Sequence, residues 1–215
     1  MATQLSLYNE ALLILGERKL ASLSEDREPR RVLDTIWDYN TINYVLEKGQ
    51  WTFATRSAKL EPNPSMEQAY GYAYAYEKPT DYIRLTAMCT DEYYSTPLLG
   101  YTEEGGFWFA DLDEIYIKYV SNDASFGSDY SIWPETFTRY VAHYLAFRGI
   151  KRLSQNQSDK DDIEKDMKNA LADAQSKDAL AQPTEFPPPG LWTRSRRGRR
   201  AGRSNDRGNR NRLIG

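Results

Sequence analysis

Apolar side chains recur at helical spacing in two stretches near the amino end of the chain. The first stretch, residues 3–16, ends at Gly16, a residue typical of the C-terminal cap of a helix. Its apolar face comprises Leu5, Tyr8, Ala11, Leu12 and Leu15. The second stretch runs from Pro29, which is favoured in a first helical turn, to Gly49, and therefore predicts a second amphipathic helix. Its face comprises Leu33, Ile36, Trp37, Asn40 and Tyr44.

Between Trp51 and Val120 the apolar spacing changes from about 3.6 residues to about two, which is typical of strands. Turn signals such as Pro62-Asn63-Pro64 and Glu104-Gly105-Gly106 divide this segment, so it predicts about five to seven short strands. The clearest alternation places tyrosines on one face and small residues on the other: Tyr70, Tyr72, Tyr74 and Tyr76 against Gly71, Ala73 and Ala75. We predict a small antiparallel sandwich or barrel.

Helical spacing returns after Trp133-Pro134. The apolar face of this third helix comprises Phe137, Tyr140, Val141, Tyr144, Leu145 and Leu153. Ser158 and Asp161 form a capping pair that predicts the start of a fourth helix. The face of that helix comprises Ile163, Met167, Ala170, Leu171 and Ala174. Because helices bracket the strands, we predict an α+β fold, in which both ends of the chain form a helical bundle with an inserted β segment.

The predicted organisation has four parts. Residues 1–50 and 131–182 form a helical domain, and residues 51–130 form the inserted β domain. Residues 183–193, which contain three consecutive prolines, form a stiff extended spacer. Residues 194–215 form an arginine-rich arm.

The arm differs chemically from the rest of the chain. It holds nine arginines, one acidic residue and no lysine, a net charge of +8; since the whole chain carries −3, residues 1–193 carry −11. Such a segment cannot bury enough apolar surface to fold alone, and arginine favours bidentate pairing with carboxylates or phosphates. The arm is a candidate for binding an acidic protein surface or a nucleic acid, and the alternative is a solubilising tail without a specific partner. The candidate partner-binding residues are Trp192, Arg194, Arg196, Arg197, Arg199, Arg200, Arg203, Arg207, Arg210, Arg212, Leu213 and Ile214.

Few residues suit catalysis or metal binding. His143 is the only histidine and Cys89 the only cysteine, and we interpret both as packing residues. The acidic group Asp111, Asp113 and Glu114 lacks the remaining ligands of a calcium loop and is interpreted as a solvated turn. A second acidic group, residues 159–166, fits a helix N-terminus, whose dipole it complements. We therefore expect no catalytic residue, no metal site and no cofactor.

Tyrosine is concentrated in the β segment, where eleven of the sixteen tyrosines lie between Tyr70 and Tyr130. Rows of tyrosine on strands can stack single-stranded bases, but acidic residues surround these rows, which favours a core or a protein interface. No stretch approaches the roughly 18 apolar residues that span a bilayer, and the first residues lack the features of a secretory signal. We expect a cytoplasm-like compartment and no membrane partner.

Four runs carry a family resemblance. They are residues 9–17 (NEALLILGE), 30–34 (RRVLD), 46–55 (LEKGQWTFAT) and 76–85 (YEKPTDYIRL), with Leu20 and Leu23 in the loop after the first run. In their order and spacing they resemble the head-to-tail adaptor of short-tailed bacteriophages, the tail tubular protein A family. The resemblance extends from residue 5 to about residue 175.

The resemblance implies a structural virion protein at the head–tail junction, assembled in the host cytoplasm as a ring of about twelve copies beneath the portal. It implies that the helical domain and the C-terminal segment bind the portal protein, and that the β domain faces the tail nozzle protein and the fibres. Genomic DNA would pass through the ring, and no enzymatic activity is expected. The arm departs from the family pattern; we expect it to dock on the portal, where many weak contacts act together.

Two other classes of function compete with this interpretation. A nucleic-acid-binding protein would use the arm as a phosphate clamp, although residues 1–193 are acidic and the arm offers no base-stacking aromatics. An enzyme, such as a tail-associated hydrolase of the cell wall, would need two carboxylates placed across a cleft, which no pattern in the sequence indicates.

Overall fold

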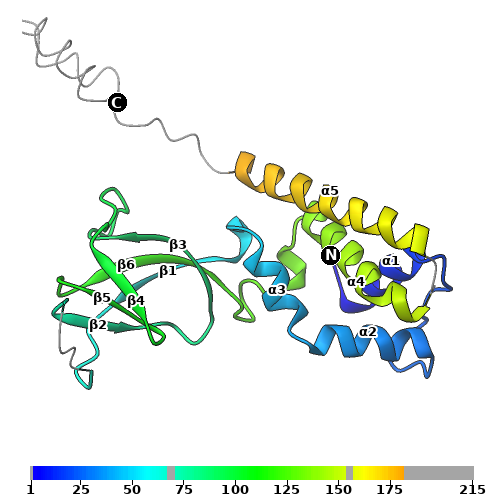
Figure 1. Ribbon diagram of the computed structural model, residues 1–215, viewed down its shortest axis with the longest axis horizontal. Helices are drawn as coiled ribbons and strands as arrows, with labels where there is room; N and C mark the ends of the chain where they lie inside the picture. The colour runs from blue at the N-terminus through cyan, green and yellow to red at the C-terminus, as the bar shows by residue number, and fades with distance from the viewer. Residues whose placement is uncertain (1, 67–70, 154–156, 182–215) are drawn as a thin grey trace, which may run out of the picture. The chain divides into compact units, whose positions relative to one another are not determined.

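Five α-helices and six strands make up the part of the chain that the computed structural model describes, residues 2–66, 71–153 and 157–181 (Figure 1). The predicted α+β class is therefore confirmed. The proline-rich spacer and the arginine-rich arm, and with them every candidate partner-binding residue from Trp192 to Ile214, lie outside the described residues.

The first helix, α1 (Gln4–Ile14), lies within the predicted stretch of residues 3–16, with its caps at Thr3 and Leu15. At its start Thr3 and Ser6 form a reciprocal capping box, in which the Ser6 amide donates to Thr3 Oγ1 at 3.1 Å and the Thr3 amide donates to Ser6 Oγ at 2.8 Å. At its end Gly16 adopts a left-handed φ of 73°. Its amide donates to the Leu13 carbonyl, and the next amide, of Glu17, donates to the Leu12 carbonyl at 2.8 Å. Gly16 is thus the C-terminal cap that the sequence indicates.

The single helix predicted from Pro29 to Gly49 is wrong. The structure has two helices, α2 (Glu28–Asp38) and α3 (Thr41–Glu47), separated at Asn40, whose φ is 55°. Asparagine tolerates this left-handed conformation better than most residues, so it can redirect the chain inside an otherwise helical pattern. The Thr41 hydroxyl donates to the Ile36 carbonyl at 2.6 Å and satisfies a group that a continuous helix would have paired.

Outside the undescribed residues 67–70, the β segment forms two antiparallel sheets of three strands each, and these six strands lie within the predicted number. One sheet has the order β1-β6-β3, with β1 (Thr55–Leu60), β6 (Ile115–Ser121) and β3 (Tyr82–Cys89). The other has the order β2-β5-β4, with β2 (Tyr74–Glu77), β5 (Phe107–Ala110) and β4 (Tyr101–Glu104). Gly105 and Gly106, both at positive φ, connect β4 to β5, as the hairpin signal indicates.

Both sheets contribute to one hydrophobic cluster. Its buried members are Tyr76, Trp108 and Ala110 from one sheet and Met88, Ile115, Ile117 and Tyr119 from the other. The predicted row of four tyrosines is not formed as such, because β2 begins only at Tyr74 and Tyr70 lies outside the described residues. Both Ala75 and Tyr76 are buried, so strict alternation also fails on this short strand.

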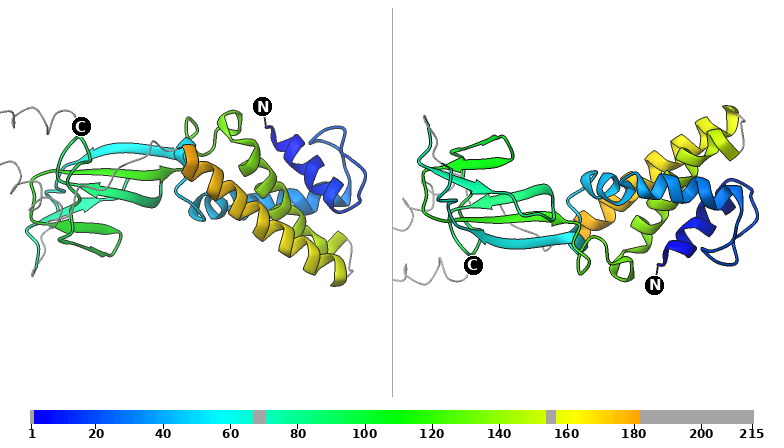
Figure 2. Two further views of the ribbon diagram at one scale, coloured as in Figure 1. Left: turned by 90° about the horizontal axis from the view of Figure 1, so that it is seen from above. Right: turned by 90° about the horizontal axis from the view of Figure 1, so that it is seen from below.

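The remaining helices are α4 (Glu135–Leu153) and α5 (Gln157–Ala181), which run side by side (Figures 1 and 2). The predicted faces of both helices pack into a second hydrophobic cluster together with α1, α2 and α3. The structure describes α5 from Gln157, and the side chain of Ser158, on which the predicted capping pair with Asp161 depends, lies outside the described residues. Two short 3-10 helices, η1 (Thr52–Ala54) and η2 (Tyr130–Ile132), lie at the two connections to the β segment.

A chain of ring contacts runs through this helical cluster. Successive centroids lie 5.9, 5.7, 5.0, 4.8 and 4.7 Å apart along the order Tyr8, Trp37, Tyr130, Trp133, Phe137 and Trp51. Each pair meets edge to face, an arrangement that the quadrupoles of the rings favour. We call this series the aromatic chain; it connects α1 and α2 to α4 and to the start of the β segment.

Candidate functional site

The first run that carries the family resemblance fixes the loop between α1 and α2. The Asn9 side chain holds the backbone of Leu20 from both sides: the Leu20 amide donates to Asn9 Oδ1 at 2.7 Å, and Asn9 Nδ2 donates to the Leu20 carbonyl at 3.1 Å. Leu20 itself is buried in the helical cluster. Arg27 Nη1 donates to the carbonyls of Arg18 and Lys19, each at 3.2 Å. The loop is therefore held in one conformation by polar contacts.

The third run centres on Trp51, which joins the helices to the strands. Its indole Nε1 donates to the Val45 carbonyl at 3.2 Å, and its ring centre lies 4.7 Å from that of Phe137. A Cβ placed on Gly49 would lie 2.7 Å from the Trp51 ring, so only glycine fits there without a shift. The C-terminal part of α5 contacts the same region, because Asp178 accepts from the Thr52 amide at 3.0 Å and from the Thr52 hydroxyl at 2.7 Å.

The fourth run places Asp81 at the centre of a polar network between β1, β3 and β6. Its carboxylate accepts from Arg56 Nη1 at 2.9 Å, from the Tyr119 hydroxyl at 3.0 Å and from the Ser121 hydroxyl at 2.5 Å. Burial opposes ionisation, but these donors hold the pKa of Asp81 below its ordinary value. Burial first, and then the bond to Asp81, raises the pKa of Tyr119 to about 12. The network thus keeps a charged carboxylate at the edge of the core.

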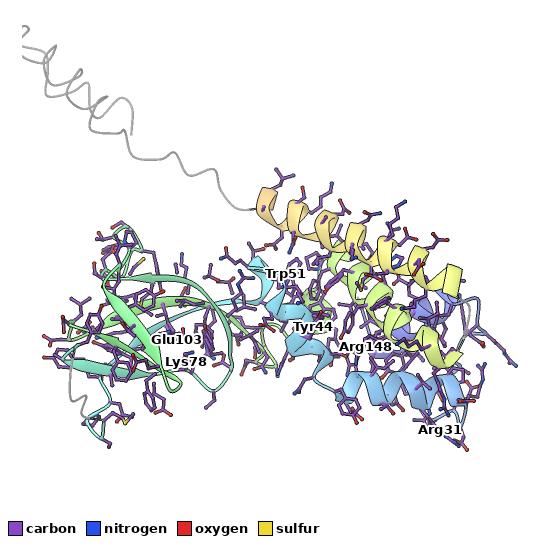
Figure 3. The ribbon with its side chains drawn as sticks, viewed as in Figure 1. Arg31, Tyr44, Trp51, Lys78, Glu103 and Arg148 are labelled. Carbon is purple, nitrogen blue, oxygen red and sulfur yellow. The ribbon has the colours of Figure 1, made fainter. Side chains whose placement is uncertain are left out.

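A second polar group of the same run is Lys78. It forms an ion pair with Glu103, and both residues are labelled in Figure 3. The Lys78 ammonium lies 5.0 Å from the ring centre of Tyr82 and 5.3 Å from that of Trp108. Glu103 also accepts from Trp108 Nε1 at 3.2 Å. Lys78 and Asp81 enter the sequence interpretation only as members of the run 76–85 (YEKPTDYIRL), with no partner assigned to either. The alternation of opposite charges around Pro79 is the one signal in the sequence that both side chains have partners.

The two residues considered for catalysis lie on different elements. Cys89 is buried at the end of β3, opposite Tyr116, and burial raises the pKa of its thiol. A raised pKa disfavours the thiolate that a nucleophile needs. His143 lies on α4, and its Nδ1 is buried without a hydrogen-bond partner among the described residues. Burial lowers the pKa of His143, which a nearby carboxylate, Asp166 of α5, partly opposes.

Stability should therefore fall as pH drops below about 6.5, the ordinary pKa of an unfolded histidine. Because the pKa of His143 in the folded chain lies below this value, the unfolded chain takes up the proton first as pH falls. The loss of stability continues until the pH reaches the lowered pKa of the folded chain. We expect the free energy of unfolding, measured with urea, to change less between pH 7 and 5 in His143→Gln than in the unchanged chain. Equal slopes for both proteins would show that His143 does not control this range.

Members of the two acidic groups singled out from the sequence form hydrogen bonds and ion pairs with other residues of the same chain. Asp111 accepts from the Ala73 amide at 2.8 Å, and Glu114 pairs with Lys59 at 2.9 Å. On α5, Glu164 pairs with Lys168 at 2.7 Å. Within residues 2–66, 71–153 and 157–181, no group of three or more His, Cys, Asp or Glu side chains is arranged to hold a metal ion. Across the same residues, no helix combines the length and apolarity that crossing a membrane requires.

Exposed aromatic residues gather near the junction of α2 and α3. Tyr44, which is labelled in Figure 3, stacks on Tyr144 of α4 with ring centres 5.0 Å apart. The Lys48 ammonium lies 4.2 Å from the Tyr44 ring centre. Tyr39, between the two helices, is exposed. Sequence reasoning placed Tyr44 on the buried face and missed this surface, because the break at Asn40 was not recognised.

Comparison with known protein families gives no match for this chain, and a search of curated proteins finds no match either.

Proposed function

We propose that this chain is a ring-forming head-to-tail adaptor of a short-tailed bacteriophage. In this proposal the helical domain and the C-terminal arm dock on the portal protein. The β segment, acting as a small sandwich, faces the tail nozzle protein and the fibres. The ring of about twelve copies forms part of the channel for genomic DNA at the head–tail junction of the virion.

One observation carries the proposal: the runs that resemble the adaptor family have structural roles at defined positions. Asn9 fixes the first loop, Trp51 joins helices to strands, and Asp81 organises the end of the sheet where β3 begins. Residues with such roles constrain the fold rather than a reaction. A resemblance that consists of these residues therefore supports a shared architecture, and the adaptor role follows from that architecture by analogy.

The arm is the part of the proposal that rests on charge alone. With nine arginines in residues 194–215, it can pair with carboxylates of a portal, and many arms acting together bind far more tightly than one. The same composition favours a second candidate, a phosphate clamp on DNA. The two candidates differ in the ligand that the arm needs, so they can be separated by experiment.

The test compares the full chain with a chain truncated after Leu191, each mixed with the portal of the same phage and, separately, with short duplex DNA. We expect the full chain to form closed rings of about twelve copies, alone at high concentration or on the portal, in negative-stain images and by mass measurement. Truncation should weaken portal attachment, and salt should weaken it in the full chain, because exposed charges are screened over about 8–10 Å.

A strict monomer or dimer that ignores the portal would contradict the adaptor proposal. If truncation leaves portal attachment unchanged and removes DNA binding, the arm is a phosphate clamp and its assignment to the portal is wrong. Circular dichroism of the truncated chain serves as the control for folding.

A further inference from the structure

The sheet of β2, β5 and β4 carries one aromatic ring between two carboxylates. The register pairs Glu77 of β2 with Phe107 of β5, and it pairs Phe107 with Glu104 of β4. Residues directly opposite each other on antiparallel strands project from the same face, with Cβ atoms about 4.5–5.5 Å apart. The three side chains therefore form one line across the sheet, which we call the outer row.

The outer row points away from the hydrophobic cluster of the β segment. The next row of the same register includes Tyr76 and Trp108, which are fully buried in that cluster. Because successive side chains of a strand alternate between the two faces of a sheet, the outer row lies on the opposite face. Both of its carboxylates are exposed, and Phe107 is half-buried. Of the residues that the structure describes, none forms a hydrogen bond or an ion pair with either carboxylate.

The neighbouring row shows how this chain binds a cation with the same kinds of side chain. Lys78 pairs with Glu103, and its ammonium lies 5.3 Å from the ring centre of Trp108 and 5.0 Å from that of Tyr82. One carboxylate and two aromatic rings thus hold one cation. The outer row offers one ring and two carboxylates, and no cation from the described residues pairs with them.

Arginine is the cation that fits the outer row best. Its planar guanidinium can stack on the ring of Phe107 while its N–H groups pair with the carboxylates on either side. The surrounding chain adds long-range attraction, because the segment from Tyr101 to Glu114 contains five acidic residues and no lysine or arginine. The outer row is therefore suited to an arginine-rich segment.

The arginine-rich arm of the same chain has this composition. Residues 194–215, which lie outside the described residues, contain nine arginines and no lysine and carry a net charge of +8, against −11 for residues 1–193. A segment that is tethered to its binding surface needs little affinity, since a short flexible linker supplies an effective concentration of the order of millimolar. A weak contact is therefore sufficient to hold the arm on the sheet.

The outer row lies within reach of the arm. The Asp178 carboxylate accepts from the Thr52 amide at 3.0 Å, so the last described turns of α5 are held beside the residues that precede β1. From Thr52, a path across the paired strands β1, β6 and β3 and back along the chain to the outer row measures at most about 50 Å, at about 3.6 Å per residue and about 5 Å per strand pair. Extended at about 3.1 Å per residue, residues 182–203 span about 65 Å.

We propose that arginines of the arm bind the outer row of their own chain, with a guanidinium stacked on Phe107 and paired with Glu77 and Glu104. This contact involves a single copy, so it goes beyond the portal contact described above and does not depend on it. A portal has to compete with the outer row for the same arginines. The free chain thereby covers its most basic segment until a more acidic partner displaces it.

A nitroxide label on the full chain locates the arm by nuclear magnetic resonance. Ala201→Cys supplies the attachment site within the arm, because Cys89 is 3% exposed and does not compete for the label. We expect the amide signals of Glu77, Phe107 and Glu104 to broaden more than those of the rest of the β segment, and to recover when the nitroxide is reduced. Raising the salt concentration from about 0.1 M to about 1 M shortens the screening length from about 10 Å to about 3 Å and should remove most of the broadening.

Variants of the labelled chain test the chemistry of the outer row. Glu77→Gln with Glu104→Gln should weaken the contact at least about tenfold, because both charge-assisted hydrogen bonds are lost. Phe107→Leu keeps an apolar side chain without a ring and should weaken the contact about threefold. The matched control, Glu92→Gln with Asp173→Asn, removes the same two charges from exposed positions elsewhere and should leave the broadening unchanged. Far-ultraviolet circular dichroism verifies that each variant is folded.

Three outcomes would overturn this inference. The first is the absence of broadening at the outer row, and the second is an equal reduction by the double glutamine variant and its matched control, which would mean that the arm responds to net charge alone. The third concerns a mixture of isotope-labelled chain without nitroxide and unlabelled chain with nitroxide. Broadening in that mixture, and its loss when the doubly labelled chain is diluted with unlabelled chain, would show that the arm binds another copy. None of these outcomes bears on the adaptor proposal, which is tested by ring formation and portal attachment.

Discussion

Replacing Trp51 with alanine should lower the free energy of unfolding by about 3–5 kcal/mol, a large share of the total for a domain of this size. Trp51 is 1% exposed, and its ring centre lies 4.7 Å from that of Phe137 and 6.1 Å from that of Phe53. Its removal opens a cavity where helices and strands meet, and it leaves the Val45 carbonyl without its indole donor. Urea unfolding followed by far-ultraviolet circular dichroism would measure the loss.

Two variants make the Trp51 result interpretable. Tyr39→Ala removes an exposed aromatic ring from the same helical domain and should cost less than about 0.5 kcal/mol. Trp51→Phe keeps much of the ring volume but loses the bond to the Val45 carbonyl, so it should lie between Tyr39→Ala and Trp51→Ala. A Trp51→Ala loss no larger than that of Tyr39→Ala would show that this residue does not join the helices to the strands.

Gly127→Ala should destabilise the protein by about 3 kcal/mol, at the upper end of overpacking effects. A Cβ at this position would overlap the Ser121 carbonyl oxygen and lie 2.6 Å from Leu46 Cδ1. The backbone oxygen cannot rotate away as a side chain can, and it already accepts from the Gly127 amide at 3.1 Å. The loop after β6 would have to shift, and with it the bond from Trp133 Nε1 to the Gly127 carbonyl at 2.9 Å.

Gly100→Ala is the matched control, because a Cβ there meets no atom within 4 Å and the glycine is not at positive φ. It should change the thermal midpoint little. Equal midpoints for Gly127→Ala and Gly100→Ala would mean that the loop after β6 relaxes freely, and the close approach to Ser121 would then have no energetic consequence.

Local patterns predicted the elements well where one periodicity governs a long segment. The faces of α4 and α5 were read correctly, and so was the cap of α1 at Gly16, because capping chemistry acts within one turn. The break at Asn40 was missed, since the apolar spacing continues across it and only the tertiary position of α3 requires the left-handed residue. The tyrosine alternation did not predict the short strand β2 for a related reason. Contacts with β5 define the length of β2, and the sequence pattern does not contain them.

The polar groups were the least predictable part. Asp81 meets Arg56, Tyr119 and Ser121 only after three strands are paired, so their sequence separation hides the network. The exposure of Tyr93 and Leu99, between β3 and β4, was also not anticipated, because strand propensity says nothing about which side chain is exposed. Trp192 and the arm residues up to Ile214 remain predictions based on charge.

The aromatic chain has a mechanical consequence. Edge-to-face rings in a close-packed interior leave little room for compression, so such a core passes strain on instead of absorbing it. The chain of rings begins at Tyr8 on α1 and ends at Trp51, four residues before β1 starts at Thr55. A displacement of α1 should therefore reach the start of β1 through packed rings, so that the positions of these helices and of the strands should change together.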